Sequence, residues 1–308
     1  MKILNQSSVI AENVATVGFF DGVHAGHRFL IEELKAIAQA ERLLSLIFTF
    51  SSHPRKILHS DFQPQLLTTL DEKLERLEST GVDACIVLDF SEEMAGLSAY
   101  EFLKAVLYER YNVRVLLIGH DHRFGHNRAD GFNEYKKYGE EIGMKVIQTN
   151  RYTTTQIGHI SSSEVRKALK NGDILRANEI LSYPYSFQGK VIDGYKIGRK
   201  IGFPTANIEP DDNEKLIPAT GVYAVEVKWN NCNYQGMMNI GQRPTLENGS
   251  AISIEVHIFN FDENIYNQTI EIFFLERIRD EQKFEGIDAL IIQLNKDKLK
   301  VKEFFKIS

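Results

Sequence analysis

The chain has little of several features that mark whole classes of protein. Its 308 residues include only two cysteines, Cys85 and Cys232, so neither a disulfide framework nor a Cys-x-x-Cys metal site is available. No run of about 18 apolar residues occurs, and such a run is typical of a membrane-spanning helix. Residues 1–6 also lack the apolar segment of a signal peptide. We therefore expect a cytoplasmic protein with two structural thiols and no membrane partner.

Positive charge is also scarce. The 36 Lys and Arg residues are outnumbered by 42 Asp and Glu residues, which gives a formal net charge of -6 and a pI near 5.9. A general nucleic-acid binder needs a basic face, so we expect no nucleic-acid partner. A small nucleotide held by a few local groups is compatible with this charge. The length allows two domains, each with its own core.

The most informative stretch is residues 16–27, which predicts a strand, a glycine-rich turn and a helix start. Residues 13–20 are apolar and rich in β-formers, as in a strand buried on both faces. From Gly26 onward, apolar residues recur at helical spacing. Gly22 and Gly26 let the backbone approach a ligand where a Cβ atom would collide. Because a helix N-terminus favours an anion, the stretch predicts a phosphate site.

Two histidines in this stretch sharpen the hypothesis. His24 and His27 are three residues apart at a helix start, so both could donate to phosphate oxygens from one face. The pattern His-x-Gly-His resembles the signature of the nucleotidyltransferase superfamily, which includes the class I aminoacyl-tRNA synthetases. On this motif alone, two surface histidines beside an ordinary βα turn stay an alternative.

Strand-like and helical runs alternate through the first half of the chain. The alternation predicts a parallel sheet with helices on both faces, where ligands gather at the carboxyl ends of the strands. Polar loops at 50–56 and 119–128 follow two strands, so we expect them to rim one crevice with the histidine loop. The expected strands are 43–50, 82–90, 113–119 and 144–149, and the expected helices are 98–111 and 132–142.

Residues 160–166 place serine hydroxyls at a predicted helix N-cap, with Arg166 three residues beyond Ser163. Such a cap is commonplace, but Arg166 is also suited to neutralising phosphate charge. A helical pair at 163–170 and 174–181 then closes the expected first domain, residues 1–183.

The second half changes to short alternating strands with glycine turns, which predict a small antiparallel barrel or sandwich. An apolar stripe between Phe284 and Leu294 predicts a helix that packs across it as plain core. We therefore expect a second domain of residues 184–308. Its predicted strands are 221–228, 234–240, 252–259 and 269–275.

Two features of this second domain carry candidate chemistry. Residues 198–207 combine glycines, a proline, a hydroxyl and an amide that could hold a nucleotide phosphate with its Mg²⁺. A plain glycine-rich hairpin is the alternative. Strand 252–258 puts Glu255 opposite its apolar face, where it could be a solvated carboxylate or a general base for a substrate hydroxyl.

Eight motifs, in order, resemble the bacterial bifunctional riboflavin kinase and FMN adenylyltransferase family, also called FAD synthetase. Those in the first half are Gly18-Phe19-Phe20-Asp21-Gly22-Val23-His24-x-Gly26-His27, His53-Pro54-Arg55, Asp121-x-Arg123-Phe124-Gly125 and Ser161-Ser162-Ser163-x-x-Arg166. Those in the second half are Gly198-Arg199-x-x-Gly202-Phe203-Pro204-Thr205-Ala206-Asn207, Gly221-Val222-Tyr223-Ala224, Asn239-Ile240-Gly241-x-Arg243-Pro244-Thr245 and Glu255-Val256-His257.

The resemblance implies an α/β Rossmann-like nucleotidyltransferase domain, followed by a small antiparallel β-barrel riboflavin kinase domain with a C-terminal helix. It implies ATP-dependent phosphorylation of riboflavin to FMN in the C-terminal domain. In the N-terminal domain it implies adenylyl transfer from ATP to FMN, giving FAD and pyrophosphate. The implied partners are ATP, riboflavin, FMN and FAD, with Mg²⁺ accompanying ATP and no tightly bound prosthetic group required.

The resemblance also implies roles for individual residues. In the first domain, His24 and His27 bind ATP and act in catalysis, with help from Ser162, Ser163 and the catalytic Arg166. FMN lies near Asp121 and Phe124. In the second domain, Thr205 and Asn207 bind the metal and ATP, and Glu255 is the base. The other implied binding residues are Gly18, Phe20, Asp21, Gly22, Gly26, His53, Gly198, Gly202, Pro204 and Arg243.

The chain departs from the family pattern in the first domain. Ser51-Ser52 stand where an acidic residue and a proline are usual, and His122 stands where a phenylalanine is usual. The Gly-Asp that usually follows the loop arginine is replaced around Ala129-Asp130.

Three rival functions stay open. Seven of the nine histidines lie between His24 and His126, which suggests a zinc hydrolase, although no His-Glu-x-x-His helix supports one. A flavin- or nucleotide-binding regulatory protein that has lost one or both activities would share the fold. An RNA-charging enzyme would need an anticodon-binding module, which the sequence does not suggest.

Overall fold

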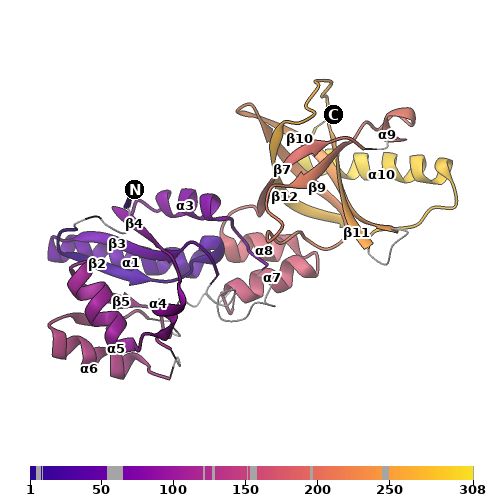
Figure 1. The fold of residues 1–308 in the computed structure, drawn as a ribbon. Coiled ribbons are helices and arrows are strands. Elements are labelled where there is room, and N and C mark those ends of the chain that lie inside the picture. Colours follow the sequence, from indigo (N-terminus) through magenta and orange to yellow (C-terminus); the bar gives the residue numbers. More distant parts are fainter. Residues whose placement is uncertain are drawn as a thin grey trace. The chain divides into compact units, whose positions relative to one another are not determined.

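The structure is a computed structural model whose description covers residues 1–4, 8, 10–53, 65–120, 122–126, 129–150, 152, 158–194, 197–244 and 250–307. Within these ranges, the side chains of residues 197, 200, 243–244 and 250–251 are outside the description. The chain divides into two compact units, Met1–Ser161 and Ser162–Ser308. Figure 1 shows a sheet with helices in the first unit and a barrel in the second.

A six-stranded parallel sheet forms the centre of the first unit, in the order β1-β4-β3-β2-β5-β6. Because the chain continues from β2 to β3 on one side and later adds β5 on the other, the strand order reverses beside β2. Ligands bind at the carboxyl ends of strands at such a reversal. The strands are β1 (Lys2–Leu4), β2 (Asn13–Val17), β3 (Leu44–Phe50), β4 (Ala84–Leu88), β5 (Val113–Ile118) and β6 (Lys145–Gln148).

Helices cover both faces of this sheet. One face carries α1 (Ala25–Glu41) and α3 (Leu70–Glu78), which pack on strand residues such as Ile47 and Cys85. The other face carries the π-helix η2 (Phe102–Arg110) and α6 (Phe132–Ile142). The shorter helices are η1 (Asp21–Val23), α4 (Glu92–Gly96) and α5 (Ala99–Glu101).

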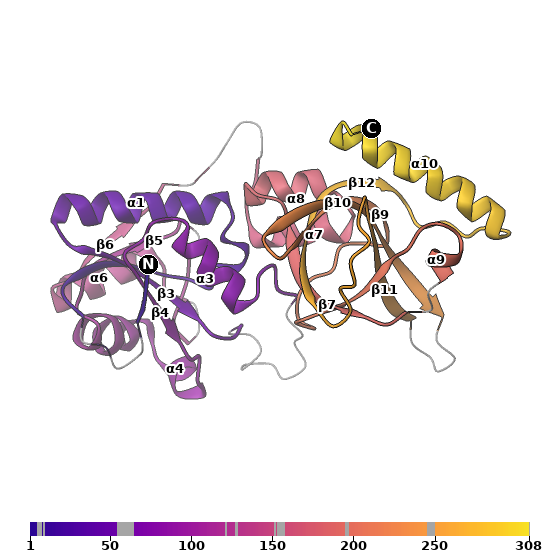
Figure 2. The ribbon, with the colours of Figure 1, turned by 90° about the horizontal axis from the view of Figure 1, so that it is seen from above.

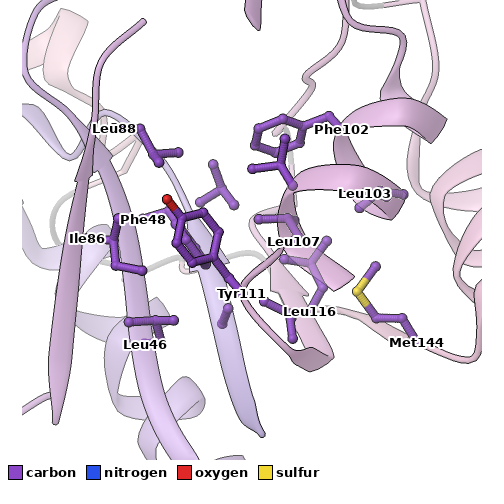
Figure 3. Packing of buried hydrophobic residues seen from close by; sticks show 14 of the residues in the cluster. Leu46, Phe48, Ile86, Leu88, Phe102, Leu103, Leu107, Tyr111, Leu116 and Met144 are labelled. Atoms are coloured by element: carbon purple, nitrogen blue, oxygen red, sulfur yellow. The ribbon is translucent and has the colours of Figure 1, made fainter. Parts of the chain in front are cut away.

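Figure 3 shows the second of these cores, where Tyr111 lies between the strand residue Phe48 and the helix residue Leu107. Phe48 and Ile47 are neighbours in β3, yet both are fully buried, in different cores. A strand covered on both faces in this way has no polar side, which is why these strands read as continuous apolar runs.

The second unit begins with two helices and continues as a closed antiparallel barrel, in the order β10-β11-β8-β7-β12-β9. The helices are α7 (Ser162–Lys170), α8 (Ile174–Leu181) and the short α9 (Ile197–Lys200). The strands are β7 (Ser186–Ile192), β8 (Ala206–Pro210), β9 (Gly221–Trp229), β10 (Cys232–Pro244), β11 (Ser250–Ile258) and β12 (Thr269–Arg279).

Asn178 attaches α8 to the barrel. Its amide nitrogen donates to the Phe274 carbonyl at 2.8 Å, and its amide oxygen accepts from the Tyr185 backbone N–H at 2.7 Å. These hydrogen bonds join α8 to the barrel, and α7 and α8 both belong to the second compact unit. The domain boundary that we expected after residue 183 stays a prediction.

The last helix, α10 (Ile287–Phe305), lies along the outside of the barrel (Figure 2). Its Asp297 is fully buried and forms an ion pair with Arg279 of β12, with an N–O distance of 2.8 Å. The stripe expected to be plain core is core only in part. Leu294 packs against the buried cluster of the barrel, whereas Ile287 is 61% exposed. Leu290 and Leu294 also line a cavity.

The expected fold class is confirmed in both halves, and every expected strand and helix is present, α6 and α8 with the expected ends and most of the others with shifted ends. The segment expected as one helix at 98–111 is the short α5 continued by the π-helix. Elements that the pattern did not delimit are β1, α3, α4, β7, β8 and α9. In the described part of the chain, no helix has both the length and the apolar character that a bilayer span requires.

Candidate active sites

The histidine loop joins β2 to α1 through an unusual backbone. Phe20 and Val23 have left-handed φ values of 55° and 38°, and Gly22 has φ 78°. Left-handed φ in residues other than glycine is costly and clusters at functional sites. α1 then begins at Ala25, so its free N–H groups lie directly behind the loop.

His24 is the N-cap of α1. Its Nδ1 accepts the backbone N–H of His27 at 3.3 Å. Because Nδ1 is an acceptor, the proton of the neutral imidazole lies on Nε2, where it can be donated to a ligand. A Cβ atom at Gly26 would lie 3.3 Å from the His24 ring, so the absence of a side chain at this position leaves room for the ring.

The two imidazoles stack, with ring centres 3.6 Å apart and an angle of 14° between their planes. This arrangement agrees with the expectation that both lie on one face of the helix start. Burial lowers the pKa of His27 well below its ordinary value, and the nearby His24, His122 and Lys73 lower it further. Within the described residues, the Nδ1 atom of His27 is buried without a hydrogen-bond partner. A ligand that supplied an acceptor would satisfy this nitrogen.

Asp21 holds the histidine loop against the segment that precedes α3. Its carboxylate is buried and accepts the backbone N–H groups of Leu67 at 2.9 Å and Thr68 at 3.0 Å. The Thr68 hydroxyl in turn accepts the Gly22 N–H at 3.1 Å. These contacts give Asp21 a clear role in holding the turn, and its expected part in ligand binding stays a prediction.

A cavity of about 350 Å³ opens beside this loop, among segments that follow β2, β3, β4 and β5. Its wall is mainly aromatic and aliphatic, with imidazole and guanidinium groups at intervals. Each of the three polar loops contributes some residues to this wall, as expected, although His24 and His27 of the histidine loop are not among the lining residues. The loop residues in the wall are Gly18, Phe19, His53, His122, Arg123, Phe124, Gly125 and His126.

Tyr135, which the sequence pattern did not single out, holds the Phe124 loop. Its hydroxyl accepts the Phe124 backbone N–H at 2.9 Å, and its ring stacks on the Phe124 ring at 4.2 Å. Tyr135 is fully buried on α6. Of the family departures, His122 lines the cavity, and Ser51 donates to the Asp89 carboxylate at 2.9 Å.

In the second unit, Glu255 lies on β11 with its side chain on the face expected from the alternation. Glu255 and His257 line a cavity of about 290 Å³ beside α10. Val256 and Ile258 instead line a second cavity, of about 580 Å³. The polar and apolar residues of the strand therefore face different spaces.

Thr205 lines both cavities. Its hydroxyl donates to Oε2 of Glu255 at 3.2 Å. A carboxylate on a rigid strand and a hydroxyl at the junction of two cavities can act on two molecules at once, one in each cavity.

Asn207 lies beside this pair, because β8 pairs with β11 so that Asn207 is opposite Glu255. It is buried, and a Cβ atom at Gly194 would collide with its amide group. The hydroxyl of Thr205 and the amide oxygen of Asn207 are hard oxygen donors of the type that Mg²⁺ prefers. The donors present therefore fit a magnesium ion that accompanies a nucleotide.

His257 fixes the loop before Thr205. Its Nδ1 lies 2.8 Å from the Pro204 carbonyl oxygen, and because that oxygen can only accept, Nδ1 carries the proton. The His257 ring also meets the Phe203 ring edge-on at 5.4 Å. Burial lowers the pKa of His257, against a smaller opposing effect of the Pro204 hydrogen bond.

Comparison with known proteins identifies both halves. The family model of FAD synthetase matches residues 6–164, and that of riboflavin kinase matches residues 181–305. The chain is 38% identical to the bifunctional riboflavin kinase/FMN adenylyltransferase of Bacillus subtilis (strain 168), over 96% of this chain and 93% of the relative. It is 35% identical to that of Escherichia coli (strain K12), over 96% and 93%.

The chain belongs to the bifunctional riboflavin kinase/FMN adenylyltransferase family. The family resemblance, the two activities and the order of the two domains are thereby confirmed. Families of this kind use ATP, typically with a divalent metal ion, and bind riboflavin or FMN.

The fold is shared with solved structures, of which one example follows. It is described as the macrolide-efflux protein from Streptococcus pneumoniae and has 30% sequence identity, with a TM-score of 0.89 over 98% of this chain and 99% of that chain.

Several expected site residues of this bifunctional enzyme stay predictions. Asp121 lies outside the described residues, as does the side chain of Arg243. Ser162, Ser163 and Arg166 belong to α7 of the second unit. Gly198 lines the smaller cavity with Thr205, whereas Gly202 is exposed, with φ 83°.

The zinc alternative has little to rest on. In the ranges that the structure describes, no three His, Cys, Asp or Glu side chains gather closely enough to hold a metal ion.

Proposed function

We propose that the second domain phosphorylates riboflavin in the smaller cavity, with Glu255 as base and Mg-ATP in the larger one. We propose further that the first domain joins the resulting FMN to an adenylyl group beside His24 and His27. The observation that carries the kinase assignment is the Thr205–Glu255 hydrogen bond at the junction of two cavities.

The lining of the smaller cavity suits a flavin. Phe203, Met237, Phe284 and Leu290 offer apolar surface to a flat ring system. The larger cavity is lined partly by polar residues, and its Arg199 suits a triphosphate, whereas Asp262 and Glu263 of the same wall suit the cation that accompanies it. A hydroxyl that enters from the flavin side would therefore meet a γ-phosphate near Thr205.

Glu255 supplies the base that a neutral alcohol needs in order to attack a phosphate group. Its carboxylate takes the proton of the ribityl 5′-hydroxyl as that oxygen bonds to the γ-phosphorus, and ADP leaves with the bridging oxygen. Thr205 and Asn207 would hold Mg²⁺, which neutralises triphosphate charge when bound. Because the Thr205 hydroxyl gives its hydrogen to Glu255, its oxygen lone pairs can face a cation.

Adenylyl transfer needs no base, because the FMN phosphate is already an anionic nucleophile. A phosphate oxygen bonds to the α-phosphorus of ATP, and pyrophosphate leaves. The protein's contribution is positioning and charge neutralisation. His24 donates from Nε2, and the α1 N-terminus adds its free N–H groups. We assign the flavin to the cavity of about 350 Å³ with Phe124, and the phosphates to the histidine pair.

The remaining expected contacts complete this proposal. Ser162, Ser163 and Arg166 belong to α7 of the second unit, so their part in ATP binding stays a prediction from the family resemblance, as does the part of Asp121 in FMN binding. Arg243 would contribute to the second site. A cytoplasmic location and the absence of a nucleic-acid partner stay predictions from composition.

Two variants test the assignment. Glu255→Gln keeps the size of the side chain and removes the base, so conversion of riboflavin to FMN should fall by at least about 100-fold. Conversion of supplied FMN to FAD should be unchanged. His27→Ala should reverse this pattern. Chromatography of each half-reaction reads the result, and Glu209→Gln, an exposed carboxylate on β8, is the matched control for the first variant.

Two outcomes would contradict the proposal. If both variants impaired both half-reactions alike, the two-site assignment would be wrong. If the wild-type protein bound flavin and ATP but formed neither product, the regulatory-protein alternative would replace it.

A further inference from the structure

Lys73 is a buried lysine that the proposed mechanism does not yet use. It lies on α3 and is only 3% exposed. Its Nζ donates to the Phe50 carbonyl oxygen at 2.9 Å and lies 4.2 Å from the centre of the Phe19 ring. Lysine is almost never fully buried unless it is paired. A methionine would fill similar space without the cost of removing a charge from water.

The two partners of Lys73 lie at the carboxyl ends of neighbouring strands. Phe50 is the last residue of β3, and Phe19 follows the end of β2. Both line the 350 Å³ cavity, and the Phe19 ring also meets the ring of His53, another wall residue, at 4.7 Å. Lys73 itself is absent from the described lining of that cavity, so it supports the wall from behind.

Charged and titratable groups face Lys73 from three other elements. Burial lowers its pKa to about 8, although Asp21 of η1 and Cys85 of β4 act to raise it. Lys73 in turn helps to lower the pKa of His27 on α1, although burial, His24 and His122 lower it more. At pH 7 the ammonium group is therefore mainly charged, and the histidine loop lies within reach of its field.

We propose that Lys73 is a positioning residue for adenylyl transfer. Its ammonium group ties the ends of β2 and β3 together behind Phe19. It also places a positive charge between the flavin cavity and the His24–His27 loop, where the FMN phosphate must approach ATP. This inference rests on the proposed assignment of FMN to that cavity.

The test compares Lys73→Met and Lys73→Arg with the wild-type protein in both half-reactions between pH 6.5 and 9.5. Lys73→Met should lower kcat/KM for FMN adenylylation by about tenfold or more at pH 7, because the wall shifts and the charge is lost. Riboflavin phosphorylation should not change. The matched control is Lys35→Met, since Lys35 also donates to a backbone carbonyl, that of Thr80, but its side chain is 30% exposed and pairs with Glu32.

The pH profile separates a charged role from mere packing. In the wild-type protein, kcat/KM for FMN should fall as the pH rises through about 8, because Lys73 loses its proton there. Phosphate groups have already lost theirs near pH 6, and burial raises the pKa of Cys85 to about 12. Lys73→Met should lack this decline. Lys73→Arg should stay active at pH 7 and also lack it, since arginine remains charged.

Four results would overturn the inference. Adenylylation by Lys73→Met within twofold of the wild type would remove its basis, as would an alkaline decline shared by that variant and the wild type. Two further results do not depend on the folding of Lys73→Met. A wild-type kcat/KM for FMN that does not change through pH 8 would overturn the inference, and so would an alkaline fall in kcat/KM that persists in Lys73→Arg. A wild-type protein that makes no FAD from FMN would instead refute the proposed function.

Discussion

At the scale of single residues, the first unit keeps an imidazole neutral in the place where phosphate is expected. The pKa of His27 is lowered well below its ordinary value, mainly by burial. Below about pH 6.5 the unfolded chain therefore binds a proton that the folded chain does not. Stability should fall with falling pH in that range, by up to about 1.4 kcal/mol per pH unit for this group.

His27→Gln should reduce this acid sensitivity. Thermal unfolding of both proteins between pH 7.5 and 5 measures it, with the exposed His159→Gln as the matched control. If the unfolding temperature fell equally with falling pH in His27→Gln and in the wild type, His27 would not contribute to the acid sensitivity of the fold.

His257 should act on the kinase through its bond to the Pro204 carbonyl. His257→Phe removes a hydrogen bond worth about 1 kcal/mol, so kcat/KM for riboflavin phosphorylation should fall about fivefold. His257→Asn places an amide N–H near the position of Nδ1 and should recover part of the loss. Steady-state kinetics with riboflavin varied across its KM at saturating ATP would measure kcat/KM for both variants, with FMN adenylylation unchanged. A loss in His257→Asn as large as in His257→Phe would exclude the hydrogen bond as the cause.

The sequence could identify residues whose chemistry is local in the chain. His24 and His27 lie within one motif, and Glu255 is given by the alternation of one strand. Lys73 could not be found in this way, because it lies in a charged helix, Leu70–Glu78, that reads as a solvated surface. Its burial depends on Phe50 and Phe19, which come from two other segments.

At the scale of elements, the attachment of α10 to the barrel depends on a buried ion pair. Arg279 donates to both oxygens of Asp297, at 3.0 and 2.9 Å from its Nε. Asp297→Ala would leave Arg279, whose side chain is only 12% exposed, without its carboxylate partner, and removing one member of a largely buried ion pair costs about 3 kcal/mol. Arg279 lines the smaller cavity, so the kinase should weaken together with stability.

Thermal unfolding and both half-reactions would measure this effect. Asp288→Ala, an exposed position on the same helix, is the matched control. If Asp297→Ala unfolded at the same temperature as Asp288→Ala, the ion pair would not hold the helix.

Elements with a strong period were predictable, and short or mixed ones were not. β4 is apolar throughout and β3 is apolar except for Ser45 and Thr49, so the sequence indicated both strands well. β8 has only five residues and ends in Pro210, and it depends on pairing with β7 and β11. The buried face of α3 includes the charged residues Glu72 and Lys73, so the sequence does not show a clear apolar face for this helix. Its one local signal is the capping box of Thr69 and Glu72.

At the scale of the whole molecule, the central claim is that two nucleotide sites work on two separately packed units of one chain. The histidine pair belongs to the first unit and Glu255 to the second. Each unit has a core of its own, so a substitution in one site should leave the other site intact.

Mixing two single-site variants tests this claim most directly. Glu255→Gln supplied with riboflavin should form neither FMN nor FAD, and His27→Ala should accumulate FMN. An equimolar mixture of the two, given riboflavin, ATP and Mg²⁺, should form FAD, because FMN released by one variant is adenylylated by the other. Accumulation of FMN in the mixture without FAD, or FAD formation from riboflavin by either variant alone, would contradict the account.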